Sequence, residues 1–535
     1  MAESADNLEA ILCRNGTETP EPVKAEVSGT IPPWLQGTLL RNGPGLFTIG
    51  NSSYDHWFDG MALIHSFTFK DGEVYYRSKF LKSDTYKKNI TANRIVVTEF
   101  GTLSVPDPCK NIFSKAFTYL LKVIPNFTDN NLINIIRYGD DYYASSEIQY
   151  INQINPLTLD TTGRVNYRNH IALNLATSHP HYDDEGNTYN MGTAIIGLGK
   201  PKYVIFKVPA HATDLKDKKN LKNPALKNLQ QICSIPFRST LFPSYFHSFG
   251  MTENYIIFVE QPFKLDIVRL ATAQIRGVTW GRCLKFDQDD NTLFHVINKK
   301  TGKALSTKFY GNAFVVFHHI NAYEEDGHVV FDLITYKDNS LYDMFYIKNM
   351  RENRTSNKSS KDISPPICQR FVLPINADFK GNSLGSNLVT LENTSSTAAL
   401  QKDGSVYCTP ETLFQGLELP EINYKYNGKK YRYFYGSRVE WLPQSNKIAK
   451  VDTATKTHIE WTEEDCFPSE PKFVASPGAV DEDDGVVLSS VVSVNPQKPP
   501  FMLVLDAKDF TEIARATINF PVHLDLHGLF IPQSS

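Results

Sequence analysis

The stretch LATSHPHYDD, Leu175–Asp184, places two histidines around a proline within a polar turn of a chain that is otherwise rich in strand-like segments. Pro180 lacks an N–H group, so it suits the end of a strand better than the centre of a hydrogen-bonded ladder. Side chains repeat every second residue along a strand, so His179 and His181 would share one side if both lay in it. The motif is therefore typical of a strand end, from which one imidazole at most needs to reach a common site.

Short β-branched or aromatic runs separated by polar breaks continue on both sides of this motif. Examples are NYIIFVE at 254–260, HVVFDLITY at 328–336 and GVVLSSVVSV at 485–494, and several runs end in turn signals such as KDG. Amphipathic helical periodicity is confined to 110–124 and 263–276. The pattern predicts an all-β fold of antiparallel meanders with two helical insertions.

No composition change divides the chain of 535 residues, so we expect a single domain over residues 21–535, preceded by a flexible N-terminal extension at 1–20. So long an all-β domain must hide its sheet edges, either by closing a barrel or by repeating blades around an axis. Four histidines in strand-like contexts follow one another at steps of 68, 71 and 209 residues, and the last step is close to three times the others. They are His179, His247, His318 and His527.

This step of about 70 residues is longer than a minimal propeller blade of roughly 40–45 residues, but it fits four strands with long loops. The chain then has room for about seven blades. If one inner strand of each blade points its histidine at the axis, these four side chains converge. His318 and His319 are adjacent and must face opposite sides of a strand, so only one of them needs to take part.

A site of neutral imidazoles alone could hold zinc, copper, nickel or iron. A zinc site with four protein ligands would have a complete coordination shell and a structural role. An iron(II) site with four histidines has coordination positions left for dioxygen or substrate. Carboxylates should then accept the remaining ring N–H groups and fix the tautomers. Glutamates in apolar or aromatic surroundings are the candidates, namely Glu147, Glu418 and Glu470.

The charge balance and the chain start exclude several classes of protein. With 55 basic and 58 acidic residues the formal net charge is −3, so the chain lacks the basic footprint of a nucleic-acid-binding protein. The start has no signal-peptide pattern, and no run of about 18 apolar residues occurs. The seven cysteines form no CxxC pair. We expect a cytosolic protein with reduced thiols and no obligate protein partner.

Several separated motifs then resemble one family. LLRNGPG, HWFDGMALIHSF, ATSHPHYD, YFHSFG, FHHINAYEEDG, FPSEP, EDDGVVLS and LHGLF are similar to the carotenoid cleavage oxygenases, from about Glu21 to the C-terminus. The resemblance implies a seven-bladed β-propeller with a cap of helices and loops over an iron(II) ion on the axis. It implies His179, His247, His318 and His527 as the iron ligands. Glu147, Glu418 and Glu470 would accept hydrogen bonds from the rings of these ligands. His181 and His319 keep a structural role.

Among the animal members, GLELPEINY, PCKNIFSKAFTYL and DLHGLFI most resemble the dioxygenases that split the central 15,15′ double bond of β-carotene with O₂. The resemblance therefore implies an enzyme that forms two molecules of all-trans-retinal. Eccentric 9′,10′ cleavage and isomerohydrolysis of a retinyl ester stay open as alternatives on the same fold. A propeller that binds a carotenoid around a structural zinc, without catalysis, is a third.

A rigid apolar polyene needs a tunnel lined with hydrophobic and aromatic side chains. By resemblance, the tunnel candidates are Phe58, Tyr245, Tyr336 and Phe467, and ordinary packing in the protein core is the alternative for each. Two positions depart from the family pattern, because Phe246 stands where Tyr is common and Phe467 stands where Trp is common. We expect any influence of these departures to be on substrate preference, since both keep the ring.

The water-insoluble substrate has to come from a membrane or a lipid particle. Segment 110–124 places apolar residues at helical steps beside lysines, a pattern that suits weak, reversible binding in a lipid interface. The residues expected to contact lipid are Phe113, Phe117, Leu120 and Leu121. The alternative is a helix that caps the propeller and buries this face in the core. Segment 263–276 repeats the pattern more weakly.

Overall fold

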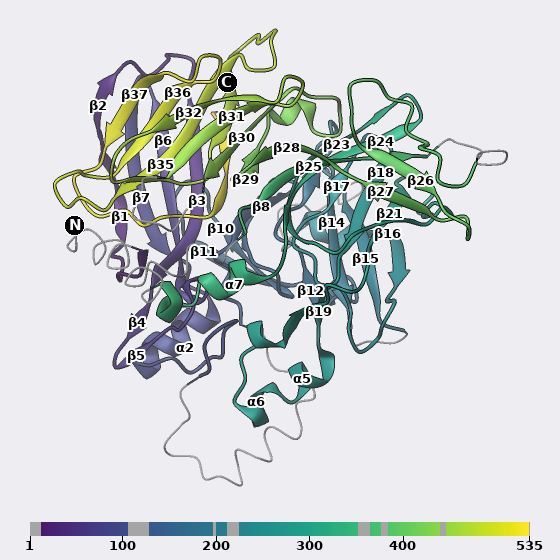
Figure 1. The fold of residues 1–535 in the computed structure, drawn as a ribbon. Helices are drawn as coiled ribbons and strands as arrows, with labels where there is room; N and C mark the ends of the chain where they lie inside the picture. Colours follow the sequence, from purple (N-terminus) through teal and green to yellow (C-terminus); the bar gives the residue numbers. More distant parts are fainter. Residues whose placement is uncertain are drawn as a thin grey trace.

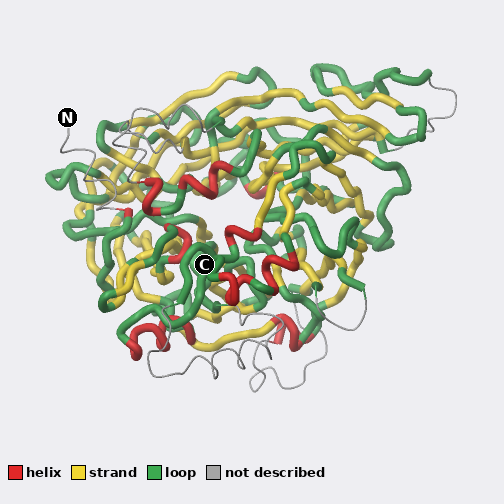
Figure 2. Tube along the Cα trace, turned by 60° about the horizontal axis from the view of Figure 1, so that its bottom comes forward, coloured by secondary structure: helices red, strands yellow, loops and turns green. Residues whose placement is uncertain are grey.

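Seven sheets, antiparallel apart from one parallel strand pair, surround a common centre in a computed structural model of the chain (Figures 1 and 2). The structure describes residues 12–104, 128–195, 200–210, 224–350, 364–375, 383–438 and 446–533. The side-chain patterns explain the strands. β7 (Glu73–Phe80) alternates between half-buried and buried residues, whereas every residue of β24 (His328–Tyr336) is buried. The seven-bladed β-propeller expected from the sequence is confirmed.

The first blade contains both ends of the propeller chain. Its strands are β1 (Thr19–Lys24), β7, β6 (Met61–Lys70), β3 (Gly37–Leu46) and β38 (His527–Pro532), in that order. The last strand, β38, pairs with β3 so that His527 lies opposite Asn42. In the same way β2 (Glu26–Gly29) adds to the outer strand of the seventh blade. These two pairings close the ring and cover edges that would otherwise be open.

The middle blades follow the chain in order. Blade two contains β8 (Asn134–Tyr138), β9 (Asp141–Ser145), β10 (Tyr150–Ile154) and β11 (Thr161–Asn166). Blade three contains β12 (Leu175–Ala176), β13 (His181–Tyr182), β14 (Thr188–Ala194), β15 (Lys202–Val208) and β16 (Gln230–Pro236). Blade four contains β17 (Gly250–Met251), β18 (Tyr255–Glu260), β21 (Thr292–Asn298) and β22 (Phe309–Gly311), extended by β27 (Val406–Thr409) and β26 (Thr397–Leu400).

The remaining blades complete the ring. Blade five contains β23 (Val315–Glu325), β24, β25 (Ile367–Pro374) and β28 (Glu411–Gln415). Blade six contains β29 (Glu418–Glu421), β30 (Tyr433–Arg438), β31 (Lys447–Asp452) and β32 (Thr457–Thr462). Blade seven contains β33 (Cys466–Pro468), β34 (Lys472–Ala475), β35 (Gly485–Ser493), β36 (Phe501–Asp506) and β37 (Glu512–Thr517), besides β2.

Short helices and two small hairpins gather at one end of the propeller, the lower end in Figure 1. The helices there are α2 (Asp84–Ala92), α5 (Ile267–Ala271), α6 (Ala273–Arg276) and α7 (Ser340–Met344). A further helix, α4 (Pro224–Lys227), packs in one hydrophobic cluster with blades two and three. The hairpins are β4 (Thr48–Ile49) with β5 (Ser52–Ser53), and β19 (Phe263–Leu265) with β20 (Leu284–Phe286). They form the expected cap. Within the described residues, no helix is long and apolar enough to cross a membrane.

Two expected boundaries differ from the structure. The helix predicted over 263–276 is wrong at its start, because fully buried Phe263 pairs with Phe286 in the hairpin and the side chain of Asp266 caps α5. The ordered structure also begins before residue 21: Leu12 is buried, and its carbonyl accepts a hydrogen bond from the Trp57 indole at 3.0 Å. The helix predicted at 110–124 lies outside the described residues.

Candidate metal centre

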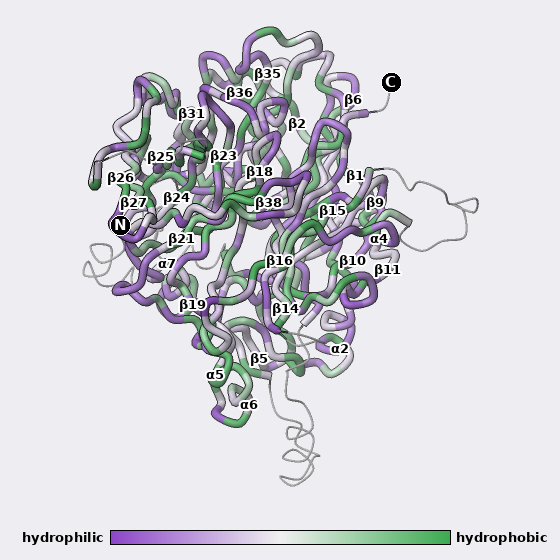
Figure 3. The backbone as a smooth tube through the Cα atoms, turned by 90° about the vertical axis from the view of Figure 1, so that its right-hand side faces the viewer, coloured by the Kyte–Doolittle hydropathy of each residue, from purple (hydrophilic) through white to green (hydrophobic). Residues whose placement is uncertain are grey.

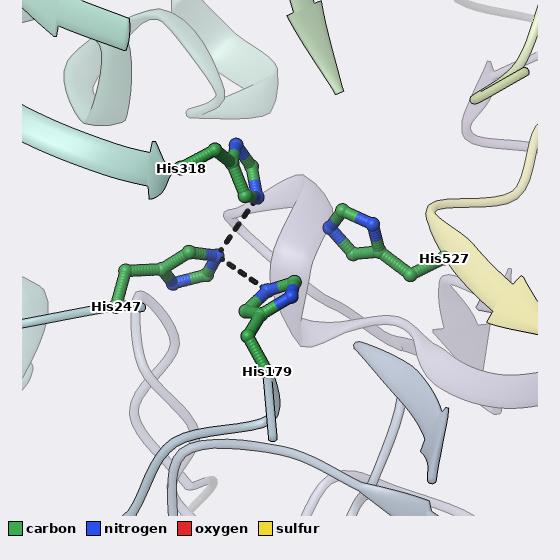
Figure 4. Close-up of side chains that lie close together, drawn as sticks. All are labelled: His179, His247, His318 and His527. Carbon is green, nitrogen blue, oxygen red and sulfur yellow. Dashed lines mark hydrogen bonds between the residues drawn. The ribbon is translucent and has the colours of Figure 1, made fainter. Parts of the chain in front are cut away.

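Four histidine side chains meet at the centre of the propeller (Figure 4). One ring nitrogen of each lies within 4.8 Å of the others. The Nε2 atoms of His179 and His247 are 2.9 Å apart, and those of His247 and His318 are 3.2 Å apart. The fourth ring belongs to His527. The four residues expected from the sequence are therefore brought together.

Each of these histidines comes from the inner side of a different blade. His179 lies in the loop between β12 and β13, His247 precedes β17, and His527 begins β38. His318 lies within β23 where the pairing with β24 shifts by one residue, as in a β-bulge, which can redirect a side chain. The step of 209 residues from His318 to His527 therefore spans three blades, as the spacing predicted.

Three of the four rings contact a glutamate through Nδ1. Glu418 Oε2 lies 2.6 Å from His318 Nδ1, and Glu470 Oε1 lies 2.7 Å from His527 Nδ1. Glu147 Oε1 lies 2.6 Å from the Nδ1 atom of His247. A carboxylate at Nδ1 holds the proton there and leaves the Nε2 lone pair directed at the centre.

These glutamates belong to the three blades that supply no histidine. Glu147 lies between β9 and β10 in blade two, Glu418 begins β29 in blade six, and Glu470 lies between β33 and β34 in blade seven. Each of the seven blades thus contributes one side chain to the centre, either a histidine or the carboxylate behind one.

Burial favours the neutral form that a metal requires at two of the rings, His179 and His527. Desolvation lowers the pKa of His179 well below its usual value, and the neighbouring imidazoles act in the same direction. Desolvation also lowers the pKa of His527 to about 4, although the nearby Glu470 opposes this shift. Four imidazole nitrogens around one point are a donor set that suits a divalent transition metal. The residues present therefore fit a metal ion.

A buried arginine supports the His527 side of the centre. Arg41 donates from Nη1 to Glu470 Oε2 at 2.6 Å, from Nε to Asp525 Oδ1 at 2.7 Å and from Nη2 to the Leu526 carbonyl at 2.8 Å. Burial opposes ionisation of Glu470, but Lys472, His527 and Arg41 outweigh it and lower its pKa. Sequence reasoning missed Arg41, although it stands in the quoted motif LLRNGPG.

Tyrosine hydroxyls hold the other two glutamates. Tyr336 donates to Glu418 Oε1 at 2.6 Å, and Tyr245 donates to Glu147 Oε2 at 2.7 Å. Leu419 also donates its backbone N–H to Glu418 at 2.8 Å, from a left-handed conformation with φ of 51° that is unusual for leucine. Both tyrosines were expected only as tunnel rings, and no local sequence pattern indicates these hydrogen bonds.

A cavity of about 730 Å³ adjoins the histidines, and His247, His318 and His527 belong to its wall. Phe58, Tyr245 and Tyr336 line it, as expected for tunnel residues. Its other large rings and aliphatic side chains include Trp57, Phe100, Leu270, Trp280, Phe317, Tyr342 and Phe345. A mostly apolar wall with few polar groups suits a long hydrophobic ligand.

Phe467 lies in a different environment. Its ring is buried in the core cluster that also contains Trp57 and Val492, and it is absent from the cavity wall. Phe246 likewise packs against Phe258, at a ring-centroid distance of 5.6 Å. The two departures from the family pattern therefore fill the protein core, so any effect on substrate preference has to be indirect.

His181 and His319 point away from the four rings. His181 contacts the Phe249 carbonyl through Nε2 at 2.7 Å, and His319 contacts Ser248 Oγ through Nδ1 at 3.0 Å. His318 and His319 thus face opposite sides of β23, as predicted. His179 and His181 do not share a side, because His179 lies in the loop that precedes β13.

Comparison with known proteins identifies the family. The family model described as retinal pigment epithelial membrane protein matches residues 13–532. The chain belongs to this carotenoid oxygenase family. Carotenoid oxygenases at high identity include β,β-carotene 15,15′-dioxygenase of Gallus gallus, 60% identical over 98% of this chain and 99% of the relative. The Homo sapiens protein of that name is 57% identical over 98% of this chain and 95% of its own length.

More distant carotenoid oxygenases have other names. The mitochondrial carotenoid-cleaving dioxygenase of Pongo abelii is 42% identical over 96% of this chain and 93% of that protein. Among solved structures, cobalt-substituted Synechocystis ACO has a TM-score of 0.76 at 23% identity, over 99% of both chains. That likeness supports the propeller fold.

Proposed function

We propose that this protein is an iron(II)-dependent dioxygenase that cleaves the central 15,15′ double bond of β-carotene with O₂ to give two molecules of all-trans-retinal. The observation that carries the proposal is the centre of four converging imidazoles beside a largely apolar cavity. The names of the relatives at 57–60% identity support the same bond and the same substrate.

In this proposal His179, His247, His318 and His527 hold the metal, and Glu147, Glu418 and Glu470 orient three of the rings. An iron(II) ion held there would supply the binding and activation of dioxygen. Four nitrogen donors from separate blades leave the remaining coordination positions to small molecules. The glutamates keep the Nε2 lone pairs directed inward before the metal binds, so little reorganisation is needed.

The cavity wall selects the bond to be cleaved. Phe58 and the other rings along the wall exclude water and hold a rigid polyene in one orientation. The depth of the cavity then sets which double bond lies beside the histidines. The ring faces can also stabilise positive charge that develops along the polyene during cleavage. The protein therefore contributes orientation, water exclusion and electrostatic stabilisation to the reaction.

We further propose that the enzyme is cytosolic and collects its substrate from a lipid surface through the capping helices. Val268 in α5 and Ile275 in α6 are 51% and 70% exposed, and Leu241 and Phe242 beside them are also exposed. Figure 3 shows the hydrophobic stretches of α5 and α6 projecting from one end of the molecule. Leu270 of α5 lines the cavity, so the exposed apolar side chains adjoin its wall. The residues expected from the sequence, Phe113, Phe117, Leu120 and Leu121, lie outside the described residues.

Product analysis tests the reaction. The metal-loaded protein is incubated with β-carotene and O₂, and the aldehydes are separated by chromatography. Retinal as the sole product, at two molecules per β-carotene, is expected. Longer apocarotenals would indicate eccentric cleavage, and isomerised retinol from a retinyl ester would indicate isomerohydrolysis. Stoichiometric zinc with no O₂ uptake would favour a binding protein.

A further inference from the structure

One ionisable side chain in the cavity wall is not explained by the metal centre. The wall contains five carboxylate or guanidinium groups, namely Glu99, Glu147, Glu418, Arg438 and Asp525. Glu147 and Glu418 contact histidines, Asp525 pairs with Arg41, and Arg438 has partners of its own. Glu99 is 3% exposed, and no lysine or arginine of the described residues pairs with it. Burial of a carboxyl group beside aromatic rings costs free energy, which a bound ligand or a structural interaction has to offset.

The hydrogen bonds around Glu99 define which of its oxygens is available. Thr128 Oγ1 accepts a bond from the Asn130 backbone N–H at 2.9 Å and donates to Glu99 Oε1 at 2.7 Å. Glu99 Oε1 is therefore an acceptor already in use. For Oε2 there is no hydrogen-bond partner among the described residues. A neutral carboxyl held this way carries its proton on Oε2 and needs an acceptor.

The electrostatic environment favours that neutral form. Burial raises the pKa of Glu99 well above its usual value, and the nearby carboxyls of Asp59 and Asp129 raise it further. Asp59 is itself fully buried behind Glu99, where it accepts from Gly101 N and from Thr102 Oγ1. A protonated carboxyl in an apolar cavity is a strong hydrogen-bond donor whose cost of burial is recovered only when it meets an oxygen.

We propose that Glu99 forms a polar subsite that receives the hydroxyl group of a ring-hydroxylated carotenoid, and so determines specificity between hydroxylated and unsubstituted rings. Oε2 donates to the ligand hydroxyl oxygen, while Thr128 keeps the carboxyl in place. The wall around it provides rings for the polyene, including Phe58, Phe100 and Trp280. A carotenoid whose ring has no hydroxyl group leaves Glu99 Oε2 without a partner, so its binding free energy is less favourable.

The inference rests on the proposed function for the identity of the ligand, and its test separates the two. The measured quantity is the ratio of kcat/KM for a singly ring-hydroxylated β-carotene to kcat/KM for β-carotene itself. Glu99→Met removes the donor and should lower this ratio roughly tenfold. Glu99→Gln keeps an acceptor for Thr128 and an N–H donor for the ligand, so it should keep the ratio within about threefold. Glu325→Met is the matched control, since Glu325 pairs with Lys430 near the surface and is not part of the described cavity wall, and should leave the ratio unchanged.

A binding measurement on metal-free protein gives a second readout. The polyene should quench the fluorescence of Trp57 and Trp280, both of which line the cavity. The ratio of the dissociation constant for the hydroxylated carotenoid to that for β-carotene should rise in Glu99→Met, opposite to the fall of the kinetic ratio, because weaker binding means a larger dissociation constant. If no carotenoid is cleaved but the ratio of dissociation constants still shifts in Glu99→Met, the proposed function fails and the subsite stands. Equal loss for both ligands in Glu99→Met, or an unchanged ratio in both assays, would overturn the subsite and leave Glu99 a structural residue.

Discussion

Glu418 Oε2 lies 2.6 Å from His318 Nδ1, and this contact joins the first strand of blade six to the first strand of blade five. The two residues are 100 positions apart in the chain. The orientation of His318 therefore depends on the packing of adjacent blades as well as on its own strand. His527 and Glu470 likewise join neighbouring blades, one and seven, whereas His247 and Glu147 join blades four and two, which blade three separates.

Removal of any one of the four central imidazoles should abolish cleavage. His179→Ala, His247→Ala, His318→Ala and His527→Ala each remove one donor, so iron content should fall together with activity. Metal analysis and O₂ uptake measure both. His181→Ala and His319→Ala are the controls, because these rings contact backbone and side-chain oxygens away from the centre. Full activity in any of the first four would contradict the assignment.

Glu418 and Tyr336 should show a graded effect. Glu418→Ala leaves His318 without its partner and should cost about 10–100-fold in iron affinity or activity. Tyr336→Phe removes one hydrogen bond to Glu418 and keeps the ring in the cavity wall, so a loss of roughly 2–10-fold is expected. Iron titration of the two variants distinguishes them. A larger loss for Tyr336→Phe than for Glu418→Ala would show that the tyrosine acts mainly on the substrate.

Arg41 should matter for stability. Arg41→Met leaves Asp525 buried without its cation and leaves Glu470 with Lys472 alone, and breaking a buried pair in this way costs about 3–5 kcal/mol. Chemical denaturation measures the loss. The control is Arg432→Met, whose ion pair with Asp452 lies at the surface and should contribute little. Similar small losses in both variants would mean that Arg41 is dispensable for folding.

Asp59 should make stability depend on pH. Burial raises its pKa from 3.8 to about 7 in the folded protein. The folded state therefore holds a proton that the unfolded state has lost, so this contribution to stability is complete below pH 4 and disappears as pH rises towards 7. Asp59→Asn should gain stability relative to the parent over that window, by about 1.4 kcal/mol per pKa unit at most. Denaturation at several pH values tests it; a difference that is constant with pH would show that Asp59 keeps its charge.

The capping helices should affect uptake from lipid more than catalysis. Val268→Ser combined with Ile275→Ser removes exposed apolar surface and should weaken liposome binding and cleavage of membrane-presented β-carotene. Cleavage of detergent-dispersed substrate should change less. Val480→Ser is the control, because Val480 is 86% exposed in the β34–β35 loop and lies outside this surface. Equal losses with both forms of substrate would refute uptake through α5 and α6.

The sequence by itself determined the strands and the residues that meet at the centre. Alternation of apolar and polar residues is a local property of a strand, so segments such as β7 can be read directly from it. The recurrence of histidines at about 70 residues predicted the blades, because one inner strand recurs in each. Family resemblance then selected His179 over His181 and His318 over His319, a choice that spacing left open.

Only the tertiary structure decided the interactions that join distant segments. Arg41 reaches Asp525 across 484 positions because β38 pairs with β3 to close the ring, and no local pattern encodes that pairing. Phe263 has helical spacing with its neighbours, yet the partner strand at Phe286 places it in a hairpin. The hydroxyl roles of Tyr245 and Tyr336 likewise depend on carboxylates brought close by other blades. Local periodicity sets what each segment can form, and burial against distant segments sets what it does form.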